Sequence, residues 1–333
     1  MDPPRTIDDF YEMLKAFTYD DPDGNGEDDT YGTVVSKFEG PWNVMQTWFG
    51  APNKWGIDPE GHLIPDFLTD EYREALDFFK KLYDEGLVNE DFAVMDPAEW
   101  VDPMNNGRAG VIVDVLDSGE RIRRAIEDLD KNNTDPIGLL GSVEGPRGTF
   151  NLPTSGYAGM FAIPKTKVST EEELRQVLEF LDKMNDEEAQ ILAANGLEGT
   201  HYEWTEGEFV NLSLDNEALT ADFDSLNQLL MFIPEDYGLT ETPTELKELE
   251  AEIVTENEEI VVANPAESLI SQVYSQKGQQ LDTIIQDARI QFIVGQIDEE
   301  GFNEAIALWE RSGGTELIEE MNQLYIEAHE NMD

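Results

Sequence analysis

DPDGNGEDDTYG, residues 21–32, is the stretch of sequence around which the rest of the chain is organised. Oxygen-bearing side chains occupy its first, third, fifth and ninth positions, namely Asp21, Asp23, Asn25 and Asp29. Gly26 holds the sixth position, where a calcium-binding loop of the EF type needs a residue free to take positive φ. The main-chain carbonyl of Glu27 adds an oxygen at the seventh position. This spacing predicts a calcium site.

The loop departs from the EF pattern at its twelfth position. A bidentate Glu is expected there, but this chain has Gly32, so the last ligands must come from Thr30, from water or from a distant part of the fold. One alternative is a surface turn rich in Asp, Asn and Gly, which is common in acidic proteins. Another is a calcium-dependent structural or adhesion module, which would rest on this loop alone.

Length and charge restrict the possible partners. A chain of 333 residues exceeds one ordinary core, so we expect two lobes. Asp and Glu number 73 against 21 Lys and Arg, and the formal net charge is -52. Such a surface excludes nucleic acid and anionic membranes as partners. Because salt screens this self-repulsion, we expect a halophilic protein from a salt-rich habitat.

Two absences bear on the compartment. The chain has no cysteine, which excludes disulfides and thiolate chemistry. No basic and apolar leader opens it, and no apolar run approaches the roughly eighteen residues needed to cross a bilayer. If Met1 is the true start, the sequence predicts a chain that is not exported.

Helical and strand patterns alternate in the first half of the chain. Thr6 and Asp9 form a helix cap, and an apolar stripe from Phe10 to Phe17 then leads into the loop. Thr69 caps a second helix, which Gly86 ends, and a third begins at Ser169 with its leucines facing inward. The β-branched runs 109–116 and 157–163 predict strands, so we expect an α/β fold.

The last third of the chain is predicted to be mostly helical. Helical periodicity extends over residues 218–233, 266–297, 299–311 and 314–332. Residues 234–243 and the acidic stretch 245–259 are expected to be surface segments between these helices.

Two residues have both a structural and a functional interpretation. Trp42 belongs to a cluster with Trp48 and Trp55, and such rings form cores or stack on sugars. Asp114 interrupts the apolar run 109–116. It is either a strand position that faces water or a polar group at the carboxyl end of a strand, where open α/β sheets bind ligands.

Signatures of catalysis are missing from the sequence. It contains no nucleophile elbow, phosphate-binding loop, dinucleotide fingerprint or zinc-protease motif, so nothing in it supports an enzyme. A secreted acidic glycoside hydrolase that uses two of the many carboxylates is the alternative function, because chance carboxylate pairs are unavoidable in this composition.

Several stretches together carry a family resemblance. They are PPRTIDDFYEMLKAFTYDDPDGNGEDDTYG (3–32), FLTDEYREALDFFKKLYDEGLVNEDF (67–92), GLEGTHYEW (196–204), YSQKGQQLDTIIQDARIQFIVGQ (274–296) and LWERSGGTELIEEMNQLY (308–325). In this order the chain resembles the extracellular solute-binding proteins of bacterial ABC importers, in particular the lipoprotein subgroup that includes alginate-binding proteins.

The resemblance implies a type II periplasmic-binding-protein-like α/β fold with two lobes, a helix-rich carboxyl-terminal part and an incomplete first lobe. Residues 1–150 and 209–333 would form lobe II, and residues 151–208 would be a remnant of lobe I. The chain would be a fragment, the carboxyl-terminal two thirds of a parent that is lipid-anchored at the extracellular face of the cell membrane.

The resemblance also implies a function. A monomer would capture an oligosaccharide in the cleft between the lobes and deliver it to ABC transporter permease subunits, with no bond made or broken. The family's structural calcium ion would be held by Asp21, Asp23, Asn25, the Glu27 carbonyl and Asp29. The positions most similar to the family's sugar-contacting residues are Trp42, Asp114 and Tyr157, although some members have an aromatic residue where Asp114 stands.

Overall fold

The chain folds as two compact units. The computed structural model describes residues 3–22, 24–27, 29–133, 136–156, 160–213, 216–223, 237–240 and 242–330. The first unit comprises Met1–Gly156 and Leu249–Asp333, and the second comprises Tyr157–Glu248. The predicted return at residue 209 would cut a β-hairpin, because Thr205 pairs with Glu208 and Tyr202 with Asn211. Residues 209–248 therefore go with the second unit.

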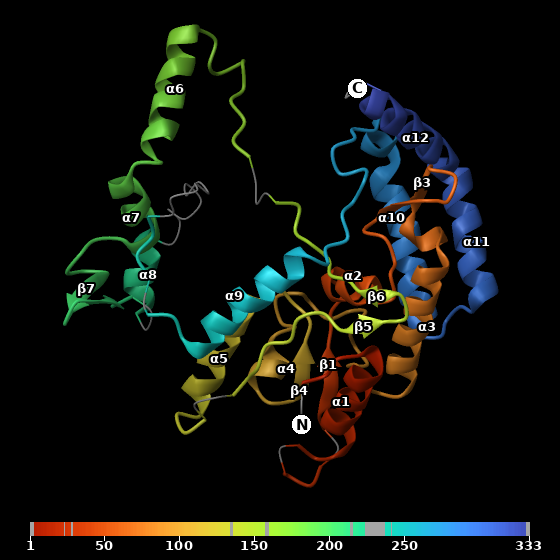
Figure 1. The fold of residues 1–333 in the computed structure, drawn as a ribbon, viewed down its shortest axis with the longest axis horizontal. Coiled ribbons are helices and arrows are strands. Elements are labelled where there is room, and N and C mark those ends of the chain that lie inside the picture. The colour runs from red at the N-terminus through yellow and green to blue at the C-terminus, as the bar shows by residue number, and fades with distance from the viewer. Residues whose placement is uncertain are drawn as a thin grey trace. The chain divides into compact units, whose positions relative to one another are not determined.

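Helices make up most of the first unit (Figure 1). In chain order they are α1 (Ile7–Tyr19), α2 (Gly40–Thr47), α3 (Asp70–Asp84), α4 (Asp102–Asn105), α5 (Ser118–Leu129), α9 (Glu245–Glu258, which begins in the second unit), α10 (Gln272–Ile293), α11 (Glu299–Trp309) and α12 (Thr315–Glu330). A 3-10 turn (Asp66–Leu68) precedes α3, and a π-helical segment (Glu310–Gly314) joins α11 to α12.

Short strands connect these helices. β1 (Tyr31–Val34) runs parallel to β4 (Ala109–Ile112), with Tyr31 opposite Ala109. The antiparallel pairs are β2 (Trp55–Ile57) with β3 (Leu63–Pro65) and β5 (Glu144–Gly145) with β6 (Gly148–Thr149). A single parallel bridge joins Asn151 to Val261, so the chain's exit from this unit lies beside its return.

The predicted cap of α1 is confirmed. The Asp9 amide donates to Thr6 Oγ1 at 3.1 Å, and the Thr6 amide donates to the Asp9 carboxylate at 3.1 Å. This reciprocal pair satisfies amides that would otherwise be left open at the helix start. The helix then buries Phe10 and Leu14, as the apolar stripe predicts.

One core unites both ends of the chain. α10 packs against α3, α11 and α12 (Figure 1), and the buried side chains include Phe10 and Leu14 from the start of the chain with Phe292 and Phe302 near its end. Burial of large apolar side chains contributes roughly 1.5–3 kcal/mol each, so this cluster stabilises the first unit.

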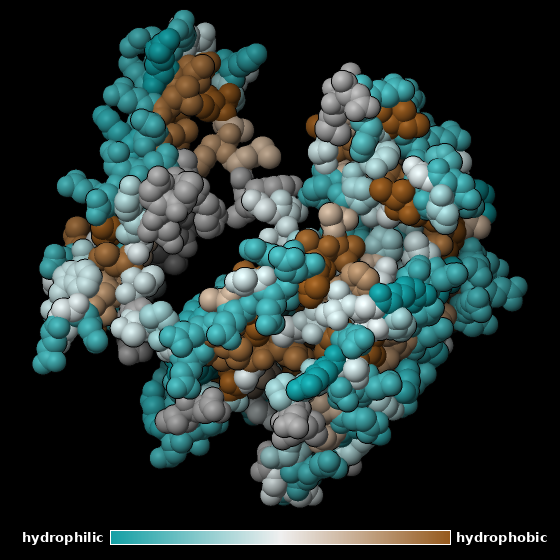
Figure 2. All heavy atoms as spheres, in the orientation of Figure 1, coloured by the Kyte–Doolittle hydropathy of each residue, from teal (hydrophilic) through white to brown (hydrophobic). Residues whose placement is uncertain are grey.

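The second unit contains α6 (Glu171–Lys183), α7 (Glu187–Asn195), the hairpin of β7 (Tyr202–Thr205) with β8 (Glu208–Asn211), and α8 (Glu217–Phe223). No side chain of α6 is buried, so the prediction that its leucines face inward is wrong. Leu174, Leu178 and Phe180 are exposed instead, and Figure 2 shows apolar side chains along one side of this helix. No described neighbour covers that side.

A further sequence prediction fails in part. Residues 160–163 form no strand, and residues 157–159 lie outside the described part of the chain. The acidic stretch 245–259 lies at the surface as expected, with Ile253 as its buried residue, and Glu245–Glu258 is helical because glutamate favours helix. Within the described residues no helix has the length and apolar character that a membrane span requires.

Candidate functional site

The loop after α1 closes on itself as an EF-type loop does. The Gly26 amide donates to Asp21 Oδ2 at 3.0 Å, which ties the sixth position to the first. Gly26 has a φ of 80°, as the pattern requires, and the Asn25 side-chain amide donates to Asp29 Oδ1 at 3.2 Å. Three of the predicted ligand side chains therefore lie on one closed loop, while Asp23 falls outside the described residues.

The loop has no assembled metal centre in the part of the chain that the structure describes. No group of three or more His, Cys, Asp or Glu side chains able to hold an ion was found there, and that part lacks Asp23. The Arg108 guanidinium also lies 3.5 Å from the Asp29 carboxylate. An ion that used Asp29 would have to compete with this cation.

Trp42 lies in the core rather than on a surface. It is 3% exposed, and its ring centroid lies 4.8 Å from that of Phe79 and 5.4 Å from that of Phe92. Contacts at these distances are those of aromatic packing. Trp42 therefore has a packing role. It lines neither of the two cavities described below.

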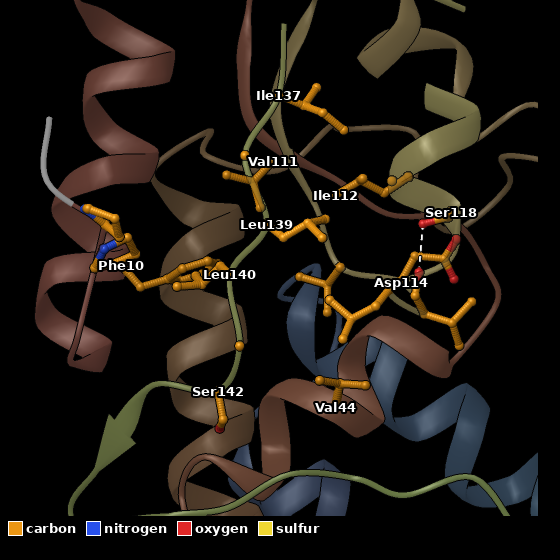
Figure 3. Close-up of a pocket in the computed structure, with 18 of the residues that line it drawn as sticks. Phe10, Val44, Val111, Ile112, Asp114, Ser118, Ile137, Leu139, Leu140 and Ser142 are labelled. Carbon is orange, nitrogen blue, oxygen red and sulfur yellow. Dashed lines mark hydrogen bonds between the residues drawn. The ribbon is translucent and has the colours of Figure 1, made fainter. Parts of the chain in front are cut away.

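Asp114 lines a large apolar groove of about 1080 Å³. Figure 3 shows Val111, Leu139 and Leu140 around this groove, with Asp114 at one side near Ser118. Ser118 itself donates to the Val115 carbonyl at 2.8 Å. Hydrocarbon dominates the lining, so the groove offers few hydrogen bonds to a sugar. Tyr157, the third predicted sugar contact, lies outside the described residues.

A second cavity, of about 450 Å³, has the mixed lining that a sugar needs. We call it the polar pocket. Trp55 and Tyr274 supply aromatic faces, and Tyr274 is 49% exposed. Amide and charged groups complete the lining, among them Asn43, Gln46, Asp66, Asp282 and Arg289. Aromatic faces that stack on sugar rings and polar groups that bind hydroxyls are the two elements of carbohydrate recognition.

Arg289 is fixed at the base of the polar pocket. It is 5% exposed, and its guanidinium lies 2.7 Å from Glu39 Oε1 and donates to Asn43 Oδ1 at 2.9 Å. A buried cation needs such partners, because its desolvation would otherwise cost several kcal/mol. The three side chains come from α10, from α2 and from the residue preceding α2, so the contact also joins the two helices.

Asp66 and Gln46 form a second polar pair. Gln46 Nε2 donates to Asp66 Oδ2 at 2.9 Å, and the Phe67 amide donates to Asp66 Oδ1 at 2.7 Å. Burial raises the pKa of the Asp66 carboxyl to about 6 despite these bonds. Gln46 is 2% exposed, and its Oε1 has no hydrogen-bond partner among the described residues.

Tyr274 and Asp282 form one wall of the polar pocket, two turns apart on α10. The Tyr274 hydroxyl donates to Asp282 Oδ2 at 2.7 Å. Burial, together with this bond, raises the pKa of the Tyr274 hydroxyl to about 12. The bond fixes the ring while half of its surface stays open to a ligand.

The polar pocket lies beside the bridge between Asn151 and Val261 in the first unit. Leu152 and Asn264 line it, and each follows a partner of the Asn151–Val261 bridge closely in the chain. The Asn53 amide also donates to the Val262 carbonyl at 3.2 Å. Sequence reasoning missed this site because its residues are scattered over the chain. The available signal was Arg289, a cation among the buried residues Leu281, Ile285 and Phe292 of α10.

Comparisons with known proteins give one family match and several long relatives. Residues 1–191 match the family described as bacterial extracellular solute-binding protein. Lipoprotein LipO of Bacillus subtilis (strain 168) is 55% identical over 331 residues, which are 98% of this chain and 66% of LipO. The polygalacturonan/rhamnogalacturonan-binding protein YtcQ of the same organism is 33% identical over 329 residues, 98% of this chain and 65% of YtcQ. The chain thus spans about two thirds of either relative's length.

A solved structure shares the fold at low sequence identity. The substrate-binding protein FusA of an S. pneumoniae ABC transporter, solved in complex with kestose, has a TM-score of 0.69 and 18% identity. The match covers 99% of this chain and 70% of FusA. FusA was also solved as an EF-hand mutant, for which the TM-score is 0.67.

Proposed function

Because this chain belongs to the bacterial extracellular solute-binding protein family, we propose that it captures an oligosaccharide for an ABC importer and passes it to the permease subunits. The observation that carries this proposal is the polar pocket, where the exposed face of Tyr274 and the ring of Trp55 stand beside amide and carboxylate groups. Stacking on such faces and hydrogen bonds to hydroxyls would hold a sugar without reacting with it.

The proposal includes no bond cleavage. The relative YtcQ is named for binding polygalacturonan and rhamnogalacturonan, and FusA was solved in complex with kestose, which supports a binding role for this chain. Asp114 and Tyr157, which the resemblance predicts as sugar contacts, stay in the proposal in that role. Trp42 does not, because its ring is buried against Phe79 and Phe92. Lipid anchoring of the natural protein, supported by the name of LipO, and action as a monomer belong to the same proposal.

Calorimetric titration of the natural protein with neutral and acidic oligosaccharides tests the proposal. Tyr274→Ala should weaken binding of the best ligand about tenfold, because one aromatic contact is removed, while stability hardly changes at a residue 49% exposed. Tyr19→Ala, an exposed tyrosine outside the pocket, is the matched control and should bind as the wild type does. Release of reducing ends, or equal binding by the Tyr274 variant, would contradict the proposal.

We also propose a structural calcium ion in the loop at residues 21–32, held by Asp21, Asp23, Asn25, the Glu27 carbonyl and Asp29. The bond from Gly26 to Asp21 and the EF-hand of FusA support it. Calcium should raise the unfolding temperature by several degrees, and a chelator should reverse the rise.

Asp21→Ala should abolish the calcium-induced rise, since it removes the first ligand and the acceptor for the Gly26 amide. Asp58→Ala, in another acidic turn of the same unit, is the control for charge loss and should keep the rise. A calcium-insensitive wild type would refute the ion site and leave the sugar-binding proposal untouched.

A further inference from the structure

The charges that line the polar pocket are unequal. Its carboxylates are Glu39, Asp66, Glu267 and Asp282, and its cations are Lys54 and Arg289. Membership of the family does not determine whether the bound sugar is neutral or acidic. The charges that line the pocket favour one of these two classes. A ligand that carries carboxylates and one that carries only hydroxyls would meet very different electrostatic fields here.

The buried cation of the pocket is already paired with a carboxylate. The Arg289 guanidinium lies 2.7 Å from Glu39 Oε1 and also donates to Asn43. The other cation, Lys54, is exposed at the rim. Two further carboxylates, Asp66 and Glu267, accept bonds from amide groups of Gln46 and Asn264, which carry no charge. A ligand carboxylate would therefore meet four lining carboxylates, one cation that is shared with Glu39 and one exposed lysine.

Hydrogen-bond acceptors also predominate in the pocket. Four carboxylates line it against two cations. Carboxylates accept hydroxyl protons well and cannot donate when ionised. The lining thus suits a ligand rich in O–H donors.

We propose that the polar pocket selects neutral, hydroxyl-rich sugar units and rejects uronate units. This inference rests on the proposed function, which it deepens by naming the class of sugar. It sets the chain apart from YtcQ, which is named for polygalacturonan and rhamnogalacturonan and is 33% identical over 329 aligned residues. The net charge of -52 acts in the same direction, because it repels a polyanionic ligand at longer range.

A matched pair of ligands tests the selectivity. The best neutral oligosaccharide found by titration is compared with the same oligosaccharide after its primary hydroxyls have been oxidised to carboxylates. The natural protein, in low-salt buffer free of divalent cations, should bind the oxidised form at least tenfold more weakly. Raising the sodium chloride concentration to about 0.5 M should reduce this difference in affinity, which we call the affinity gap. The reason is that salt screens charge repulsion and leaves neutral contacts unchanged.

Two variants separate local repulsion from the general charge of the protein. Asp282→Asn removes one lining carboxylate and should reduce the affinity gap at least threefold. The asparagine side chain can still accept the hydrogen bond from the Tyr274 hydroxyl. Glu304→Gln removes the same charge from an exposed position on α11 outside the pocket and should leave the gap unchanged.

The possible outcomes distinguish this inference from the proposed function. Equal or tighter binding of the oxidised sugar, or a gap that neither salt nor Asp282→Asn changes, overturns the selectivity and leaves the binding function standing. If no oligosaccharide of either kind binds, the proposed function fails and the inference fails with it. A gap that narrows with salt and with Asp282→Asn supports both.

Discussion

The buried carboxyl of Asp66 makes the stability of the folded protein depend on pH. Its carboxyl has a pKa of about 6 in the folded protein, raised by burial from an ordinary value of 3.8. The folded state therefore holds this proton more tightly than the unfolded chain does. Stability from this group is present below the unfolded pKa and is lost as the pH rises through about 6.

Asp66→Asn should thus stabilise the protein at pH 7.5 by about 1–2 kcal/mol, a figure reduced for partial solvent screening. It should change stability little at pH 4. The amide can still accept from Phe67, and a flipped Gln46 amide can accept from it. Urea unfolding at both pH values measures the difference. A variant less stable than wild type at pH 7.5 would show that the carboxylate charge itself is needed, for example by Arg289.

Single residues differ in how far the sequence predicts them. The caps at Thr6 and Thr69 were predictable because the side chain and its target amide lie three residues apart in the chain. The pairing of Arg289 with Glu39 was not, because its partners are brought together only when α10 packs near α2. Trp42 shows the same limit, since an aromatic cluster in sequence does not reveal which ring is buried.

At the scale of elements, the hairpin of β5 and β6 packs very closely on the end of α2. A Cβ at Gly145 would lie 1.7 Å from the carbonyl oxygen of Trp48, a backbone atom that cannot move alone. Gly145→Ala should therefore destabilise the first unit by about 2–3 kcal/mol, the scale of overpacking. Chemical denaturation measures this change.

The matched control for that substitution is Gly138→Ala. A Cβ at Gly138 meets nothing within 4 Å, so the alanine should be tolerated or slightly stabilising. Equal stability of the two variants would mean that the hairpin is not held against Trp48.

The helices α1, α3 and α10 were predicted well because each has an amphipathic repeat that buries one face. Predictions from hydrophobic periodicity failed where the apolar face of a predicted helix has no neighbour that buries it. α6 has the same repeat as α3, yet none of its side chains is buried. The hairpin of β7 and β8 was missed because its four-residue strands alternate only weakly, and the unit boundary was consequently placed inside it.

For the whole molecule, the predicted α/β fold of the type II periplasmic-binding-protein kind is confirmed by the family match and by the likeness to FusA. The resemblance that predicted it depended on stretches spread over most of the chain. Composition alone would have supported only a two-unit acidic protein.

The net charge of -52 leads to a prediction for the whole molecule. Sodium chloride should raise the unfolding temperature steeply up to about 0.3 M, where the Debye length falls to about 6 Å, and only gradually beyond. A calorimetric series in salt measures the curve. Sucrose, an uncharged stabiliser, controls for effects other than screening and should produce no early steep phase. A linear rise with salt would contradict both the screening argument and the halophilic prediction.

The core that joins the beginning and end of the chain also dictates an order of events during synthesis. Phe10 and Leu14 leave the ribosome long before Phe292 and Phe302, which belong to the same buried cluster. The first unit therefore cannot complete its interior until the segment around Phe302 has been made. Until then the nascent polypeptide must remain open, and anything that acts on an unfolded chain has that interval in which to bind it.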